Sequence, residues 1–167
     1  MDAVALAREI EREDDHVTAL ELAAWIRANK PGLHVIDVRT DSEFADYHIP
    51  SAEHVPLHEL ATMTPKAGET LVLYSEGGAH AAQGWVLLRA AGHQHAYFLR
   101  GGLLDWMDDV MSPEVSGDSA AIVASLSRYF GGVPRAGERG AVPARATIAT
   151  RAQPPRDAVE RVRRRGC

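Results

Sequence analysis

Residues 71–85 read LVLYSEGGAHAAQGW, an apolar run that stops at a serine, passes two glycines and continues with a helical pattern. This order of residues is typical of a strand–loop–helix unit. In such a unit the N–H groups of the loop and of the helix start point toward the residue that ends the strand. The stretch therefore predicts a ring of backbone N–H groups around Ser75.

Two further β-rich runs, LHVIDV (33–38) and HAYFLRGG (95–102), occur on either side of this unit. Helical patterns precede, separate and follow them over residues 2–13, 16–32, 80–93 and 103–111. Strands that alternate with helices indicate βα units, and hence an α/β fold with a parallel sheet covered by helices on both faces. Ligands of such sheets bind outside the carboxyl ends of the strands, which here read DVRTDSEF, HVPLHEL, YSEGGAH and LRGGLLDW.

Helix starts and stops follow from local residues. Thr18 with Glu21 three residues later forms a capping-box pattern. Asp41 or Ser42 is expected to cap a short helix that ends at Pro50. The spacing of Trp25 and Trp85 on helical faces places both side chains in the core.

The chain of 167 residues is long enough for one domain with a substantial core. We expect an acidic helix in 1–15, the main domain in 16–112, an additional helix in 113–132 capped by Asp118 or Ser119, and a basic tail in 133–167. From Gly131 onward, Gly, Pro, Ala and Arg dominate, which predicts a disordered segment.

Charge is divided unevenly along the chain. Residues 1–132 carry nine Lys and Arg against twenty Asp and Glu, whereas 133–167 carry nine Arg against three acidic residues. Such a tail is typical of a solvated end, and the alternatives are a nucleic-acid-binding arm or a tail that folds back on the acidic body of the protein. The N-terminus lacks the basic and apolar regions of a signal peptide, and no apolar run is long enough to span a membrane, so a cytoplasmic location is expected.

The four stretches at the carboxyl ends, in this order and spacing, resemble the rhodanese-like domain family over roughly residues 16–112. The resemblance implies a five-stranded parallel sheet. It implies further that Gly101-Gly102 form a tight turn and that Trp106 packs in the core. It also implies a six-residue loop that starts at a nucleophilic cysteine, which carries sulfane sulfur as a persulfide to a thiophilic acceptor. Here the loop is Ser75-Glu76-Gly77-Gly78-Ala79-His80, so Ser75 takes the place of the cysteine and His80 the place of a frequent cation.

A serine cannot replace that cysteine chemically. Sulfur transfer needs a thiolate, whereas a serine hydroxyl forms no persulfide and attacks only with the help of an adjacent base. His80, oriented by Asp37 or Glu43, is a candidate base for a serine hydrolase, but the first glycine of G-x-S-x-G is missing before Tyr74. We therefore expect a domain that does not transfer sulfur through its loop.

Other polar residues have mainly structural interpretations. Arg39 is expected either to hold an anion near the loop or to pair with Glu43, and Asp37 to accept bonds from loop amides. Glu76 places a carboxylate among those amides, which argues against tight anion binding. The histidine pairs His54/His58 and His93/His95 have spacings compatible with metal binding, but we interpret them as surface residues.

The leading hypothesis is a non-catalytic binding or regulatory protein of the rhodanese-like fold, with a small sulfur-containing anion or a protein as partner, no membrane, and no cofactor or metal. One alternative is an active sulfurtransferase in which residue 75 is naturally cysteine or Cys167, the only cysteine, supplies the thiol. Another is a scaffold whose arginine-rich tail binds nucleic acid or an acidic partner. The tail has no aromatic residue to stack on bases, which disfavours nucleic acid. The oligomeric state is not indicated.

Overall fold

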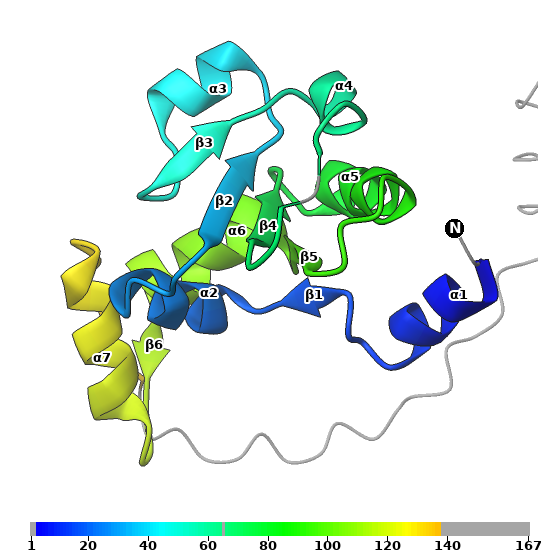
Figure 1. Cartoon of the computed structure of the whole chain (residues 1–167). Helices are drawn as coiled ribbons and strands as arrows, with labels where there is room; N and C mark the ends of the chain where they lie inside the picture. The colour runs from blue at the N-terminus through cyan, green and yellow to red at the C-terminus, as the bar shows by residue number, and fades with distance from the viewer. Residues whose placement is uncertain (1–2, 65, 138–167) are drawn as a thin grey trace, which may run out of the picture. The chain divides into compact units, whose positions relative to one another are not determined.

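A central parallel sheet organises the computed structural model, which describes residues 3–64 and 66–137 (Figure 1). Its five strands lie in the order β1-β5-β4-β2-β3 and all neighbouring pairs are parallel. This confirms the five-stranded parallel sheet. The strands are β1 (His16–Val17), β2 (Leu33–Asp37), β3 (Ala52–His54), β4 (Thr70–Tyr74) and β5 (Ala96–Leu99).

Helices follow the strands as the alternation predicts. The elements outside the sheet are α1 (Ala3–Glu11), α2 (Ala19–Arg27), α3 (Asp41–Asp46), α4 (Leu57–Leu60), α5 (Ala79–Ala90), α6 (Gly102–Trp106), the π-helical turn η1 (Met107–Met111), α7 (Ala120–Tyr129), and the short strands β6 (Glu114–Val115) and β7 (Arg135–Ala136). In the described ranges, no helix has the length and apolarity needed to cross a membrane.

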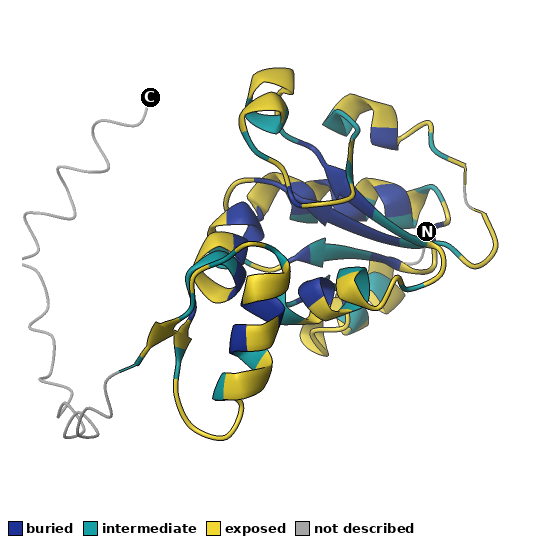
Figure 2. Cartoon of the chain, turned by 90° about the vertical axis from the view of Figure 1, so that its left-hand side faces the viewer, coloured by how far each residue is buried: buried dark blue, intermediate teal, exposed yellow. Residues whose placement is uncertain are grey.

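Two apolar clusters fill the two faces of the sheet. Alternate residues of β4 point to opposite faces, so Val72 and Tyr74 join one cluster while Leu71 and Leu73 join the other. The first cluster packs against α2, α6, η1 and α7, and the second against α4 and α5. Figure 2 shows the buried residues concentrated on the strands and on the helix surfaces turned toward them.

The tryptophans differ in their surroundings. Trp85 and Trp106 are fully buried, as predicted, and each contributes about 2–3 kcal/mol of burial free energy. Trp25 is only partly buried, which corrects its assignment to the core. Its ring packs on the margin of the first cluster with Lys30 Nζ 4.0 Å from the ring centroid, so the long Lys side chain covers what the core leaves open.

Helix caps follow the local sequence with one shift. The Thr18–Glu21 capping box forms as predicted. At α3 the capping residue is Thr40, whose hydroxyl accepts the N–H of Glu43, rather than Asp41 or Ser42. Ser119 occupies the N-cap position of α7 without a side-chain hydrogen bond to the helix.

Part of the segment expected to lack structure is ordered. Residues 131–137 continue from α7, and Arg135 and Ala136 pair with Glu114 and Val115 as a small parallel ladder. Backbone hydrogen bonds from Val133 to Met111 and from Gly137 to Val115 hold this segment against the domain. The rest of the basic tail, including Cys167, lies outside the described residues.

Candidate functional site

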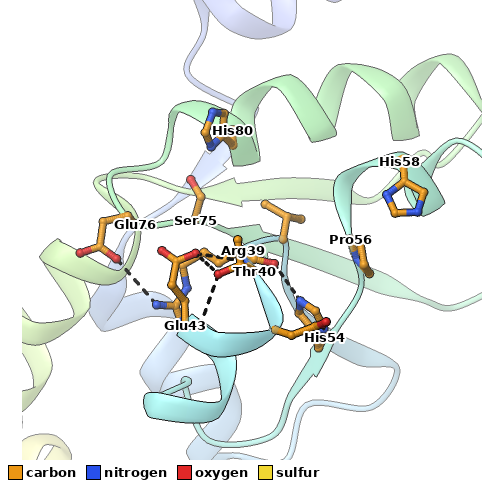
Figure 3. Close-up of a pocket in the computed structure, with 11 residues that line it drawn as sticks. Arg39, Thr40, Glu43, His54, Pro56, His58, Ser75, Glu76 and His80 are labelled. Atoms are coloured by element: carbon orange, nitrogen blue, oxygen red, sulfur yellow. Dashed lines mark hydrogen bonds and ion pairs between the residues drawn. The ribbon is translucent and has the colours of Figure 1, made fainter.

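A pocket opens at the carboxyl edge of the sheet, where the parallel topology brings three loops together (Figure 3). It has a volume of about 580 Å³. Its walls come from the segment after β2, the segment around β3 and α4, and the loop between β4 and α5. The lining residues are Val38, Arg39, Thr40, Asp41, Glu43, His54, Pro56, His58, Ser75, Glu76 and His80.

Ser75 lies at the base of this pocket. It follows the last residue of β4, and only 3% of its surface is exposed. The Ala81 N–H donates to Ser75 Oγ over 3.3 Å, and the Leu103 N–H donates to the Ser75 carbonyl over 2.9 Å. Figure 3 shows its side chain rising from the strand end between the loop at Glu76 and the helix start at His80. The serine is thus held at the positive end of α5, as the strand–loop–helix pattern predicts.

Two glycines allow the loop to adopt this shape. Gly78 caps α5 with φ +87°, a backbone conformation that glycine adopts without steric cost. Gly102 has φ +62°, and a Cβ added there would lie 2.3 Å from the Ser75 carbonyl oxygen and 2.6 Å from that of Glu76. The turn at residues 101–102 therefore supports the loop through direct backbone contact, and a side chain at residue 102 would displace it.

Arg39 and Asp37 form a buried ion pair behind the pocket. Arg39 Nη2 lies 2.7 Å from Asp37 Oδ2, Arg39 Nε lies 3.0 Å from Asp37 Oδ1, and Nη2 also donates to the Tyr47 carbonyl. Asp37 additionally accepts the backbone N–H of Arg39. Burial of the Arg39 guanidinium works against its charge, but the hydrogen bonds and charge of Asp37 outweigh it and raise the pKa of Arg39.

This pairing corrects two expectations. Asp37 accepts from Arg39 rather than from the loop amides, and the main partner of Arg39 is Asp37 rather than Glu43. Glu43 instead accepts the N–H of Thr40 in the α3 capping box. The Thr40 hydroxyl and N–H stabilise the charged carboxylate and lower the pKa of Glu43. Glu43 therefore lines the pocket with a charged carboxylate.

Glu76 belongs both to the loop and to the rim of the pocket. Its carboxylate is 59% exposed, and Oε2 lies 3.7 Å from Arg39 Nη1. The distance is long for an ion pair, and the guanidinium already serves Asp37 at 2.7 Å. The negative charge of Glu76 is thus only weakly offset.

The four histidines considered as pairs lie in different environments. His54 Nε2 lies 2.7 Å from the Arg39 carbonyl and its Nδ1 3.2 Å from Asp41 Oδ1, so it is a partly buried wall of the pocket. His58 and His95 are exposed as predicted, but His93 is buried, with Nε2 3.3 Å from the Met63 carbonyl. Over residues 3–64 and 66–137, no group of three or more His, Cys, Asp or Glu side chains is placed to hold a metal ion.

His80 is exposed at the start of α5, on the pocket wall above Ser75 (Figure 3). Among the described residues, the hydrogen bond of Ser75 Oγ comes from the Ala81 N–H, not from a histidine. A serine nucleophile needs a base within hydrogen-bonding reach. The geometry therefore gives no support to a serine hydrolase.

Several lining residues were not identified as site residues from the sequence. Asp41 and Pro56 have no distinctive motif, Thr40 belongs to a capping-box pattern with Glu43 that indicates a helix start and not a site, and His58 was considered only for metal binding. What could have identified them is their place in the sequence, because each lies in one of the stretches predicted to follow the carboxyl end of a strand.

The parallel sheet, the six-residue loop at a strand end and its supporting glycine turn define the class of protein. Residues 18–109 match the rhodanese-like domain family, and the chain belongs to this family. Thiosulfate sulfurtransferase PspE of Escherichia coli is 28% identical over 88 residues, which span 50% of this chain and 80% of that protein. A sulfurtransferase of Allochromatium vinosum is 32% identical over 75 residues, 43% of this chain and 69% of that protein.

Two other similarities extend the comparison. An uncharacterized protein of Synechocystis is 38% identical over 74 residues, and this match spans 43% of the chain and only 41% of that protein. Among solved structures, a rhodanese-like domain protein from Staphylococcus aureus aligns with a TM-score of 0.51 and 29% identity, over 57% of this chain and 93% of that one. The Escherichia coli and Allochromatium vinosum relatives are both named as sulfurtransferases.

Proposed function

We propose that this protein is a non-catalytic, ligand-binding member of the rhodanese-like family. The observation that carries the proposal is the identity of residue 75. The family resemblance implies a persulfide-forming cysteine at this position, and a hydroxyl group cannot hold sulfane sulfur. The loop nevertheless keeps its glycines, its turn at residues 101–102 and its open pocket. A site that keeps its shape and loses its thiol is suited to binding without sulfur transfer.

The test is a thiosulfate:cyanide sulfurtransferase assay on the protein and on Ser75→Cys, with Ser75→Ala as the matched control. We expect neither the protein nor Ser75→Ala to show sulfurtransferase activity. Ser75→Cys places a thiol at the start of α5, where the helix dipole and N–H groups favour a thiolate, and we expect measurable activity. Activity in the unmodified protein contradicts the proposal, whether or not Ser75→Ala retains it.

Cys167 is the competing source of a thiol. It follows an arginine-rich run that would lower the pKa of a nearby thiol, and it is the only cysteine of the chain. The variant Cys167→Ala separates this alternative from the main proposal. Sulfurtransferase activity that disappears in Cys167→Ala and persists in Ser75→Ala would assign the chemistry to the tail.

A further inference from the structure

The walls of the pocket carry more negative than positive charge. Arg39 is the one arginine among the lining residues, and its buried partner Asp37 offsets its charge at 2.7 Å. Three lining carboxylates remain, on Asp41, Glu43 and Glu76. No lysine and no second arginine is among the lining residues. The three carboxylates therefore outnumber the basic side chains of Lys and Arg type on the rim, and the one arginine is already paired.

The base of the pocket, in contrast to its acidic rim, offers hydrogen-bond donors to a negatively charged group. α5 is twelve residues long, and its first N–H groups have no partner within the helix. The Ala81 N–H uses a lone pair of Ser75 Oγ, which leaves the hydroxyl proton to donate to a ligand. Donors at the positive end of a helix favour an oxyanion. The base thus selects a negative head group, whereas the rim repels a ligand that is negative throughout.

We propose that the pocket binds a small zwitterion, with an oxyanion head in the loop and a cationic amine toward the rim, and that Glu76 sets this preference. The inference rests on the proposed function, because it takes the loop as a binding site. Glu76 is adjacent to Ser75 in the chain, so it is the rim carboxylate attached to the loop itself (Figure 3). With only a 3.7 Å approach to an already paired guanidinium, its charge is available to an amine.

Two probes that differ by one ammonium group provide the test. Taurine carries a sulfonate and an ammonium group, and ethanesulfonate carries the sulfonate alone. Each is titrated into 15N-labelled protein at pH 8, and the shifts of the loop amide resonances report binding. The variants are Glu76→Gln and, as a matched control, Glu59→Gln, because Glu59 is an exposed carboxylate outside the pocket lining.

We expect the protein and Glu59→Gln to bind taurine more tightly than ethanesulfonate, and Glu76→Gln to lose about threefold of that ratio, the size expected of one exposed ion pair. Equal binding of both probes, tighter binding of ethanesulfonate, or no shift of the loop amides with either would overturn the inference. A taurine preference that Glu76→Gln leaves unchanged would remove Glu76 from its role.

The titration and the sulfurtransferase assay can fail separately, so a failure of the ligand class is distinguishable from a failure of the proposed function. Sulfurtransferase activity in the unmodified protein contradicts the non-catalytic role but leaves the ratio of taurine to ethanesulfonate binding to be read on its own. Conversely, a failed titration with an inactive protein contradicts the ligand class alone.

Discussion

The guanidinium of Arg39 and the carboxylate of Asp37 face each other inside the domain, with side chains 6% and 0% exposed and a shortest N–O distance of 2.7 Å. The two residues lie two positions apart in the sequence, Asp37 at the end of β2 and Arg39 in the segment that lines the pocket. Arg39 also donates to the Tyr47 carbonyl beyond α3. This pair therefore ties the sheet to the segment that follows α3, and its role is structural as well as electrostatic.

Removing the Asp37 charge should be strongly destabilising. In Asp37→Asn the guanidinium stays buried without a counter-charge, which costs about 3–5 kcal/mol when one partner of a buried pair is lost. We expect a loss of about 3 kcal/mol in the free energy of unfolding, measured by urea denaturation. Asp41→Asn, at a 95% exposed side chain nearby, is the control and should change stability by less than about 0.5 kcal/mol. Equal effects of the two substitutions would contradict a structural ion pair.

Tyr74 should make stability fall at alkaline pH. Its hydroxyl is buried and accepts the Ile49 N–H over 3.1 Å. Burial, reinforced by the neighbouring Asp37 carboxylate, raises the pKa of Tyr74 far above its ordinary value of 10.0. The folded state therefore keeps Tyr74 neutral, and the resulting stability is complete below pH 10 and decreases as the pH rises above 10, where the unfolded chain ionises.

The variant Tyr74→Phe isolates this effect. At pH 8 it should lose about 1–3 kcal/mol, because the Ile49 N–H is left without its acceptor. Between pH 10 and pH 11.5 the stability gap between the protein and Tyr74→Phe should narrow by about 1.4 kcal/mol per pH unit. Urea unfolding at four pH values measures the gap. Tyr129→Phe, at a 57% exposed tyrosine, should show no such trend, and a constant gap for Tyr74→Phe would refute the assignment.

Two glycines with similar backbone angles give a matched test of the loop support. Gly102 and Gly117 have φ +62° and +73°, but only at Gly102 would a Cβ meet backbone atoms of the loop. Gly117→Ala should lose about 1–2 kcal/mol, the cost of a left-handed alanine. Gly102→Ala adds the clash with the Ser75 carbonyl, which costs about 1–3 kcal/mol more. Thermal unfolding should rank the variants in this order, and equal losses would show that the turn does not support the loop.

The contact between Gly102 and the loop backbone can also be followed by NMR at the site itself. Gly102→Ala should shift the amide resonances of residues 75–80, whereas Gly117→Ala should leave them in place. If Gly102→Ala is destabilised but its loop resonances are unchanged, the turn contributes to stability without determining the geometry of the loop.

The structural features that could be predicted are those determined by residues close together in the sequence. The run at 71–74 formed β4 because its residues are apolar throughout, as a strand buried on both faces requires. The Ser75–His80 loop followed from the glycines and the helical pattern behind it. β1 escaped prediction because two residues, His16 and Val17, carry no periodicity, and their strand exists only through pairing with β5.

Choices between competing partners could not be predicted. Arg39 had carboxylates on both sides in the sequence, and burial of Asp37 in the sheet decided in its favour over Glu43. The cap of α3, by contrast, could have been predicted, because Thr40 with Glu43 three residues later is the same capping-box pattern as Thr18 with Glu21. His93 is buried because α5 ends against the segment at Met63, a tertiary contact with no local pattern.

The capping box at α2 provides a test of a feature that the sequence did predict. The Thr18 N–H and hydroxyl both bond to Glu21, and the Thr18 hydroxyl accepts the Glu21 N–H. Thr18→Ala should therefore lose about 1 kcal/mol of unfolding free energy. Thr64→Ala, at an exposed threonine in the segment between α4 and β4, is the control and should lose less than about 0.5 kcal/mol.

The pH dependence of this loss follows from Glu21. Hydrogen bonds from the Thr18 N–H, and then from its hydroxyl, lower the pKa of Glu21 from its ordinary value of 4.5. A lowered carboxyl pKa contributes stability above pH 4.5 that disappears as the pH falls through the folded-state pKa. The difference between the protein and Thr18→Ala should thus be largest at neutral pH and shrink below pH 4.5, as followed by urea unfolding at pH 7, 4.5 and 3. A difference that stays constant over this range would mean that Glu21 does not take part in the cap.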